Sequence, residues 1–274
     1  MTTDPADSPA THPDLPEVSA RWVRMLSWYA PRYVHKNFSA VRLLGDPPDT
    51  DDPRPLLIYL NHPSWWDPMA IMLLCTLYFR HRTGYGPIDA VGLEKYRFME
   101  KLGFFGIDLQ SRAGAERFLK IGRAVLSTPN QTLWVTAEGH FTDARKRPVT
   151  LRPGVAHLAR KADPQVGAAA VPLAIEYVFG EEKQPEMRLA FGEPIVLGDT
   201  SRSASDWNTH LASCLQQTMD RLVEASLADD LSAFTTLGDG KHGVGGVYDL
   251  WRRVRAALKG ERFDAAHGSR GDAP

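Results

Sequence analysis

The chain has 274 residues, 43% of them hydrophobic, which suits one sizeable α/β domain or such a domain with a small appendage. Its 32 Lys and Arg residues nearly balance its 33 Asp and Glu residues, and it carries no usual zinc or RNA-binding signature, so we expect no nucleic-acid partner. Cys75 and Cys214 lie far apart in apolar stretches and are predicted to be thiols in a reducing cytoplasm. The alternative is a single disulfide bond between them.

The two ends of the chain differ in composition from the middle. Residues 1–16 hold four prolines and lack the basic start and apolar stretch of a signal peptide, so they are predicted to be a disordered tail. Residues 231–246 are predicted to be a Gly-rich linker, and residues 247–274 a basic C-terminal helix and tail. The longest nearly apolar run, Met69–Phe79, is about half the roughly twenty residues that a bilayer span needs.

Between these ends, residues 17–230 are predicted to form the α/β domain with an N-terminal amphipathic helix. Apolar residues at three- and four-residue spacing predict that helix over Val18–Lys36, broken near Pro31. Strand-like and helical segments then alternate, which predicts a central mixed β-sheet flanked by helices. The strand-like segments are 56–60, 88–92, 103–109, 132–136, 168–179 and 187–197; the helical segments begin near 67 or 68 and include 94–102, 113–126, 155–161 and 207–222.

A histidine follows the first of these strands. His62 stands two residues beyond Leu60, and Asp67 follows five residues later at the predicted start of a helix. A histidine and a carboxylate in this arrangement are able to form a general base and the partner that orients it. The alternative is that Asp67 caps the helix and His62 is an incidental loop residue.

Two further motifs follow other strands. Glu138 and Gly139 come directly after the strand 132–136, where a carboxylate is well placed for a site in an open sheet; the alternative is a solvated turn. Val171 and Pro172 lie inside a hydrophobic strand, where an edge position or a bulge would accommodate the proline.

Taken in order, the three motifs resemble those of the glycerolipid acyltransferases, a family that includes the lysophosphatidic acid and glycerol-3-phosphate acyltransferases. The resemblance covers roughly Leu56–Leu197 and rests on NHPSWWDP, AEGHFTD and AVPLAIEY. It implies an α/β fold with a central mixed sheet, often preceded by a helical membrane-docking element.

The resemblance also implies a mechanism. His62 would be the general base that deprotonates an acceptor hydroxyl, Asp67 its orienting partner, and Glu138 and Gly139 part of the acceptor site. The donor would be acyl-CoA or acyl carrier protein, as a co-substrate, and no cofactor or metal is implied. The family forms no acyl-enzyme intermediate, which agrees with the lack of a Gly-x-Ser-x-Gly elbow.

The chain departs from the family pattern where arginines commonly bind the acceptor phosphate. Leu109 and Phe141 stand at those two positions. We therefore expect a lipid or glycolipid acceptor without that phosphate. The alternatives are a 1-acylglycerol-3-phosphate acyltransferase with displaced ligands, a non-catalytic lipid-binding relative, and a thioester hydrolase. The displaced ligands would come from nearby arginines, namely Arg112, Arg145, Arg147 or Arg152.

Other residues near the motifs have two interpretations each. Trp65 and Trp66 would line an acyl or acceptor channel or simply pack, and His140 would touch the acceptor or lie at the surface.

Arginines beside apolar stripes in the two terminal helices, such as Arg21 and Arg252, predict a peripheral protein at the inner, cytoplasmic face of the membrane. The alternative is that both helices pack on the domain.

Overall fold

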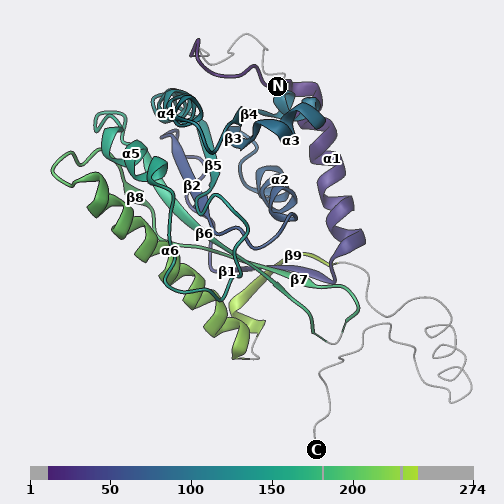
Figure 1. Cartoon of the computed structure of the whole chain (residues 1–274). Coiled ribbons are helices and arrows are strands. Elements are labelled where there is room, and N and C mark those ends of the chain that lie inside the picture. The colour runs from purple at the N-terminus through teal and green to yellow at the C-terminus, as the bar shows by residue number, and fades with distance from the viewer. Residues whose placement is uncertain (1–11, 181, 229–230, 240–274) are drawn as a thin grey trace, which may run out of the picture.

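The computed structural model describes residues 12–180, 182–228 and 231–239. These residues form a nine-stranded mixed sheet in the order β4-β3-β5-β2-β6-β7-β1-β9, with β8 paired to β6 (Figure 1). Pairing is parallel from β4 to β6 and between β7 and β1, and antiparallel for β6–β7, β6–β8 and β1–β9. The strands are β1 (Ala40–Leu44), β2 (Leu56–Leu60), β3 (Thr83–Asp89), β4 (Phe104–Ile107), β5 (Gln131–Thr136), β6 (Ala169–Val178), β7 (Glu186–Phe191), β8 (Ile195–Val196) and β9 (Phe234–Asp239).

Helices cover both faces of this sheet. Figure 1 shows α4, α5 and α6 on one side of it and α1, α2 and α3 on the other. The helices are α1 (Ala20–Asn37), α2 (Asp67–Leu77), α3 (Ala90–Lys95), α4 (Arg112–Leu126), α5 (Pro153–Lys161) and α6 (Ala204–Leu227), with short 3-10 turns η1 (Arg97–Leu102) and η2 (Leu231–Ala233). The predicted α/β fold with a central mixed sheet flanked by helices is confirmed.

The sheet has a hydrophobic core on each face, and the strand β2 contributes side chains to both. Its side chains alternate between faces, so Leu57 and Tyr59 join the cluster under α4, α5 and α6, while Leu56, Ile58 and Leu60 join the cluster under α1 and α2. Both sides are buried, which is why the sequence here is one continuous apolar run rather than an alternating one.

The N-terminal helix differs from its prediction. It is continuous from Ala20 to Asn37, with Pro31 inside it. Proline removes one backbone donor, but Ala30 and Val34 on either side are buried. The packing of this face against the domain outweighs the lost hydrogen bond.

Three segment boundaries also need correction. In the predicted tail, residues 12–16 lie on the domain: Leu15 packs against the main core, and Asp14 pairs with Lys120. In the predicted linker, residues 234–239 form β9, because their backbone groups pair with β1. The predicted strand 88–92 begins earlier, as β3, and gives way to α3 after Asp89. Residues 1–11 and 240–274, including the predicted basic C-terminal helix, lie outside the described residues.

Both cysteines are free thiols. Burial raises the pKa of the Cys75 thiol to about 12.

Candidate active site

The end of β2 holds His62 through its backbone. Asn61, almost fully buried, bridges to β6: its amide donates to the carbonyl of Ile175 and its oxygen accepts from the N–H of the same residue, at 2.9 and 2.8 Å. The N–H of His62 donates to Oε2 of Glu138 at 3.0 Å, and its carbonyl accepts from the N–H of Thr142 at 2.9 Å. The main chain at His62 is thus fixed by residues that follow β5, and its neighbour Asn61 by β6.

The first turn of α2 brings a carboxylate against this histidine. Nδ1 of His62 and Oδ2 of Asp67 are 2.6 Å apart. The Asp67 side chain has no exposed surface, and 18% of the His62 side chain is exposed. An ionised carboxylate only accepts hydrogen bonds, so this pairing favours a proton on Nδ1 and leaves the Nε2 lone pair available to a neighbouring molecule.

The second oxygen of Asp67 has a partner that the sequence analysis missed. The phenol of Tyr177, in β6, donates to Oδ1 at 2.8 Å. Burial, followed by the nearby charge of Asp67, raises the pKa of Tyr177 well above its ordinary value, so the phenol stays a donor. The alternation of side chains along β6 was the sequence feature that pointed to Tyr177. Val171 and Ile175 face α2, and Tyr177, two residues beyond Ile175, lies on the same face.

Glu138 and Gly139 lie in the turn after β5, next to His62. Glu138 is 5% exposed, and the recorded contact of its carboxylate is with the backbone of His62. Gly139 has a φ of +72°, and a Cβ there would lie 2.6 Å from Nε of Arg152. His140, two residues beyond Glu138, is exposed, and its Nδ1 lies 3.0 Å from the Glu138 carbonyl.

Aromatic rings surround the His62–Asp67 pair on two sides. The ring of Phe141 lies 4.2 Å from the imidazole, centroid to centroid, and Phe141 is 61% exposed. On the other side, the Trp66 ring packs against Phe38 and Tyr177, while Trp65 is 64% exposed. Of the two predicted tryptophans, Trp66 is therefore a packing residue and Trp65 is open to solvent.

The candidate arginines are placed very differently from one another. The side chains of Arg112 and Arg145 are 93% and 83% exposed and pair with Glu116 and Asp143, and neither has a recorded contact with His62. Arg147 pairs with Asp220 on α6. Arg152 packs against Gly139, and its Nη1 lies 3.3 Å from the carbonyl oxygen of Leu109. Arg152 thus links Gly139 to Leu109.

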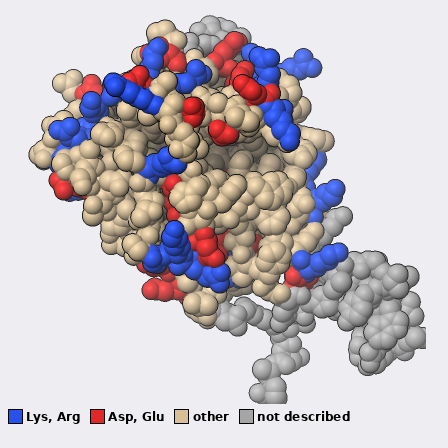
Figure 2. All heavy atoms as spheres, viewed as in Figure 1, with Lys and Arg blue, Asp and Glu red and all other residues tan. Residues whose placement is uncertain are grey.

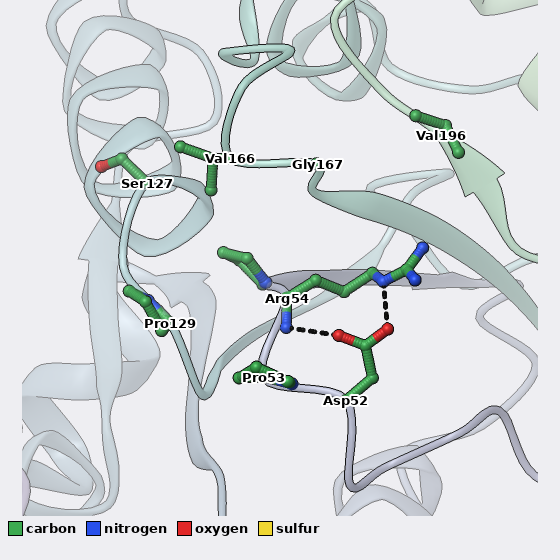
Figure 3. A pocket seen from close by; sticks show the side chains of 9 residues that line it. Asp52, Pro53, Arg54, Ser127, Pro129, Val166, Gly167 and Val196 are labelled. Atoms are coloured by element: carbon green, nitrogen blue, oxygen red, sulfur yellow. Dashed lines mark hydrogen bonds and ion pairs between the residues drawn. The ribbon is translucent and has the colours of Figure 1, made fainter.

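A hollow in the described part of the chain lies at the opposite edge of the sheet. It has a volume of about 530 Å³ and is lined by residues that precede β2, β5 and β6, together with Val196. Figure 3 shows Arg54 and Asp52 paired beside it, with Pro53 and Pro129 nearby. His62, Glu138 and Tyr177 stand at the other ends of those strands, so this hollow is remote from them.

The middle of the chain matches the family model named Acyltransferase. The match spans residues 46–176, slightly less than half of the chain. This span contains His62, Asp67 and Glu138. The chain carries an acyltransferase-family domain. The predicted family is confirmed, and with it the prediction of an enzyme of the O-acyltransferase class.

A solved structure is also similar. It is the 1-acyl-sn-glycerophosphate (LPA) acyltransferase PlsC from Thermotoga maritima, 15% identical, with 73% of this chain and 79% of that one covered and a TM-score of 0.49. No curated protein sequence matches the chain.

Two further observations concern the described residues only. They contain no group of three or more His, Cys, Asp and Glu side chains arranged to hold a metal ion. None of their helices is both long enough and apolar enough to cross a bilayer.

Proposed function

We propose that this acyltransferase moves a fatty acyl group from acyl-CoA or acyl carrier protein to a hydroxyl of a lipid or glycolipid. His62 is the general base, and Asp67 orients it. The observation that carries the proposal is the 2.6 Å contact between His62 Nδ1 and a fully buried carboxylate, within an acyltransferase-family domain.

In the proposed reaction, Nε2 of His62 takes the proton of the acceptor hydroxyl as its oxygen attacks the thioester carbonyl. Asp67 stabilises the imidazolium that forms. The tetrahedral intermediate then collapses, the carbon–sulfur bond breaks, and the departing thiolate takes the proton from the imidazolium. An ester and a free thiol result, and His62 returns to its neutral form without a covalent enzyme intermediate.

The surroundings of the imidazole support an acceptor without a phosphate. The Phe141 ring lies beside that of His62, and Leu109 is 37% exposed, so apolar side chains stand where the family commonly has arginines. A buried phosphate needs charged or hydrogen-bonding ligands to replace its hydration, and these two side chains offer none.

One observation favours a second candidate, a 1-acylglycerol-3-phosphate acyltransferase. Arg152 lies against Gly139, two residues before Phe141, and donates to the carbonyl of Leu109, one of the two positions that lack the family's arginines. Its planar guanidinium has five N–H donors, and only one of them is used in the recorded contact with Leu109. Arg152 is therefore the arginine best placed to bind an acceptor phosphate.

We also propose that the protein acts at the inner face of the cell membrane, held there by α1 and its neighbours. The outer side of α1 exposes Met25 and Trp28, at 49% and 59%, and η1 adds the exposed Phe98, whose ring stacks on that of Trp22. Figure 2 shows basic side chains along the edge where Figure 1 places α1. Apolar groups among basic ones suit the interface of an anionic bilayer.

A product screen tests the proposed function. The purified protein is incubated with acyl-CoA and a panel of lysophospholipids, glycolipids and lipid alcohols, and products are identified by mass spectrometry. We expect a new ester of at least one lipid hydroxyl. Release of free fatty acid with every acceptor would instead indicate a thioester hydrolase, and no turnover of any donor would favour a non-catalytic lipid-binding protein.

A further inference from the structure

The Asp67 carboxylate is enclosed by three donors, two from the loop between β2 and α2 and one from β6. Oδ2 lies 2.6 Å from His62 Nδ1 and 3.3 Å from the N–H of Ser64, while Oδ1 accepts from the Tyr177 phenol at 2.8 Å. No surface of the Asp67 side chain is exposed. Water therefore does not compete for these oxygens in this arrangement, and the donors alone set the orientation of the carboxylate.

Tyr177 is itself held in place by packing. Its ring lies 5.4 Å from that of Trp66 and 5.9 Å from that of Phe38, centroid to centroid. Phe38 follows α1, Trp66 precedes α2 and Tyr177 ends β6, so three elements meet around one phenol. A phenol fixed in this way has little freedom to point elsewhere.

We propose that Tyr177 is a positioning residue for the His62–Asp67 pair: its phenol holds Oδ1 of Asp67 so that Oδ2 faces His62 Nδ1. This inference rests on the proposed function of His62. Without the phenol, Oδ1 would lie in an apolar cluster with no donor, and the carboxylate would rotate toward Ser64 or His62 to recover a hydrogen bond. Either rotation changes the angle at which Asp67 meets the imidazole.

Tyr59 provides a matched control for this proposal. Tyr59 is fully buried, and its phenol, like that of Tyr177, donates one hydrogen bond, here to the carbonyl of Leu211 at 3.1 Å. It lies on the opposite face of the sheet, under α6, away from His62. Tyr59→Phe and Tyr177→Phe therefore remove the same atom, from a fully buried ring and a partly buried one, and only the second touches Asp67.

The experiment compares the two variants by steady-state kinetics and by proton NMR of histidine-labelled protein. The proton shared by His62 and Asp67 should give a low-field signal, assigned by its loss in His62→Ala. Tyr177→Phe should shift or broaden that signal and lower kcat by about 10- to 100-fold, the range expected for loss of a hydrogen bond to a charged group. Its KM should stay within about twofold, and Tyr59→Phe should change neither the signal nor kcat.

The outcomes separate this inference from the proposed function. An unchanged low-field signal in Tyr177→Phe overturns the positioning role, whatever the kinetics, and so do equal changes in the two variants, because general loss of packing would explain both. The NMR signal needs no turnover, so it is read in the same way even if no acyl acceptor is found. Failure of the proposed function would instead show as wild-type acyl transfer in the His62→Ala variant.

Discussion

At the residue scale, the chemistry of the site depends on a buried charge that is fully hydrogen-bonded. Asp67 has partners on both carboxylate oxygens and no contact with solvent. A buried carboxylate is costly unless paired, so its retention here is best explained by what it does for His62.

The variant Asp67→Asn separates the charge of this residue from its shape. The amide nearly keeps the volume, but it loses the charge that supports the imidazolium, and its NH2 group donates where the carboxylate accepts. We expect kcat to fall by about 10²–10⁴-fold, the range that positioned proton transfer supplies. Acyl-CoA binding, measured by calorimetry, should persist. A variant with near-normal kcat would contradict the proposed role of Asp67.

The acceptor is a second question at this scale. With Leu109 and Phe141 at the two family positions, lysophosphatidic acid should compete poorly with an uncharged lipid alcohol for the same acyl-CoA, and inorganic phosphate should inhibit only weakly. Phe141→Arg is expected to raise activity on the phosphorylated acceptor. Product ratios in a mixture of both acceptors measure the preference directly.

Arginine variants decide what a contrary result means. If lysophosphatidic acid is preferred, our interpretation of the acceptor is wrong. If Arg152→Ala then abolishes this preference, Arg152 binds the acceptor phosphate. If Arg145→Ala abolishes it instead, the phosphate is bound by the exposed loop that carries Arg145. Arg117→Ala is the control, since Arg117 is an exposed arginine on α4.

At the element scale, α1 joins the candidate site to the proposed membrane surface. Its inner side contributes Val34 to the core that includes the face of β2 next to α2, and Phe38, just after it, touches Trp66 and Tyr177. Its outer side carries exposed aromatic and basic residues. The helix that we propose contacts lipid is therefore continuous with the packing around the Tyr177 phenol.

Vesicle sedimentation tests the role of this helix. The protein should sediment with anionic vesicles at low salt, and less so as salt screens the basic side chains. Met25→Ser with Trp28→Ser should weaken sedimentation, because both side chains are exposed and their loss should leave the core intact. Leu227→Ser, at the exposed end of α6, is the control and should have no effect. Equal sedimentation with neutral and anionic vesicles would contradict the electrostatic part of the proposal.

Sequence patterns located most elements well, and their failures have physical causes. The strands at 56–60 and 132–136 were predictable as short apolar runs, and the helix α4 because its apolar residues recur at helical spacing. The strand β9 was missed because its six residues, with a single glycine, were grouped with the Gly-rich stretch that follows; they are ordered here by pairing with β1. The helix α1 passes through Pro31 because tertiary packing, which local rules ignore, holds both sides of it.

At the scale of the whole molecule, strand order determines which residues meet. β2 lies between β5 and β6, so His62, Glu138 and Tyr177 converge at one edge of the sheet although they are far apart in sequence. Spacing within one segment was enough to predict the His62–Asp67 pair. Tyr177 could not be predicted in the same way, because its contact with Asp67 depends on the position of β6 beside β2 and on the packing of α2.

The most direct test of the central claim is acyl transfer to a lipid hydroxyl by wild type, His62→Ala and His62→Gln. The glutamine variant retains a side-chain donor near Asp67 and so guards against unfolding caused by an unpaired buried charge. Both variants should bind acyl-CoA and keep a cooperative unfolding transition, with turnover lowered by at least about 10²–10⁴-fold. If either folded variant retains most of the wild-type turnover, His62 is not the general base and the proposed mechanism is wrong.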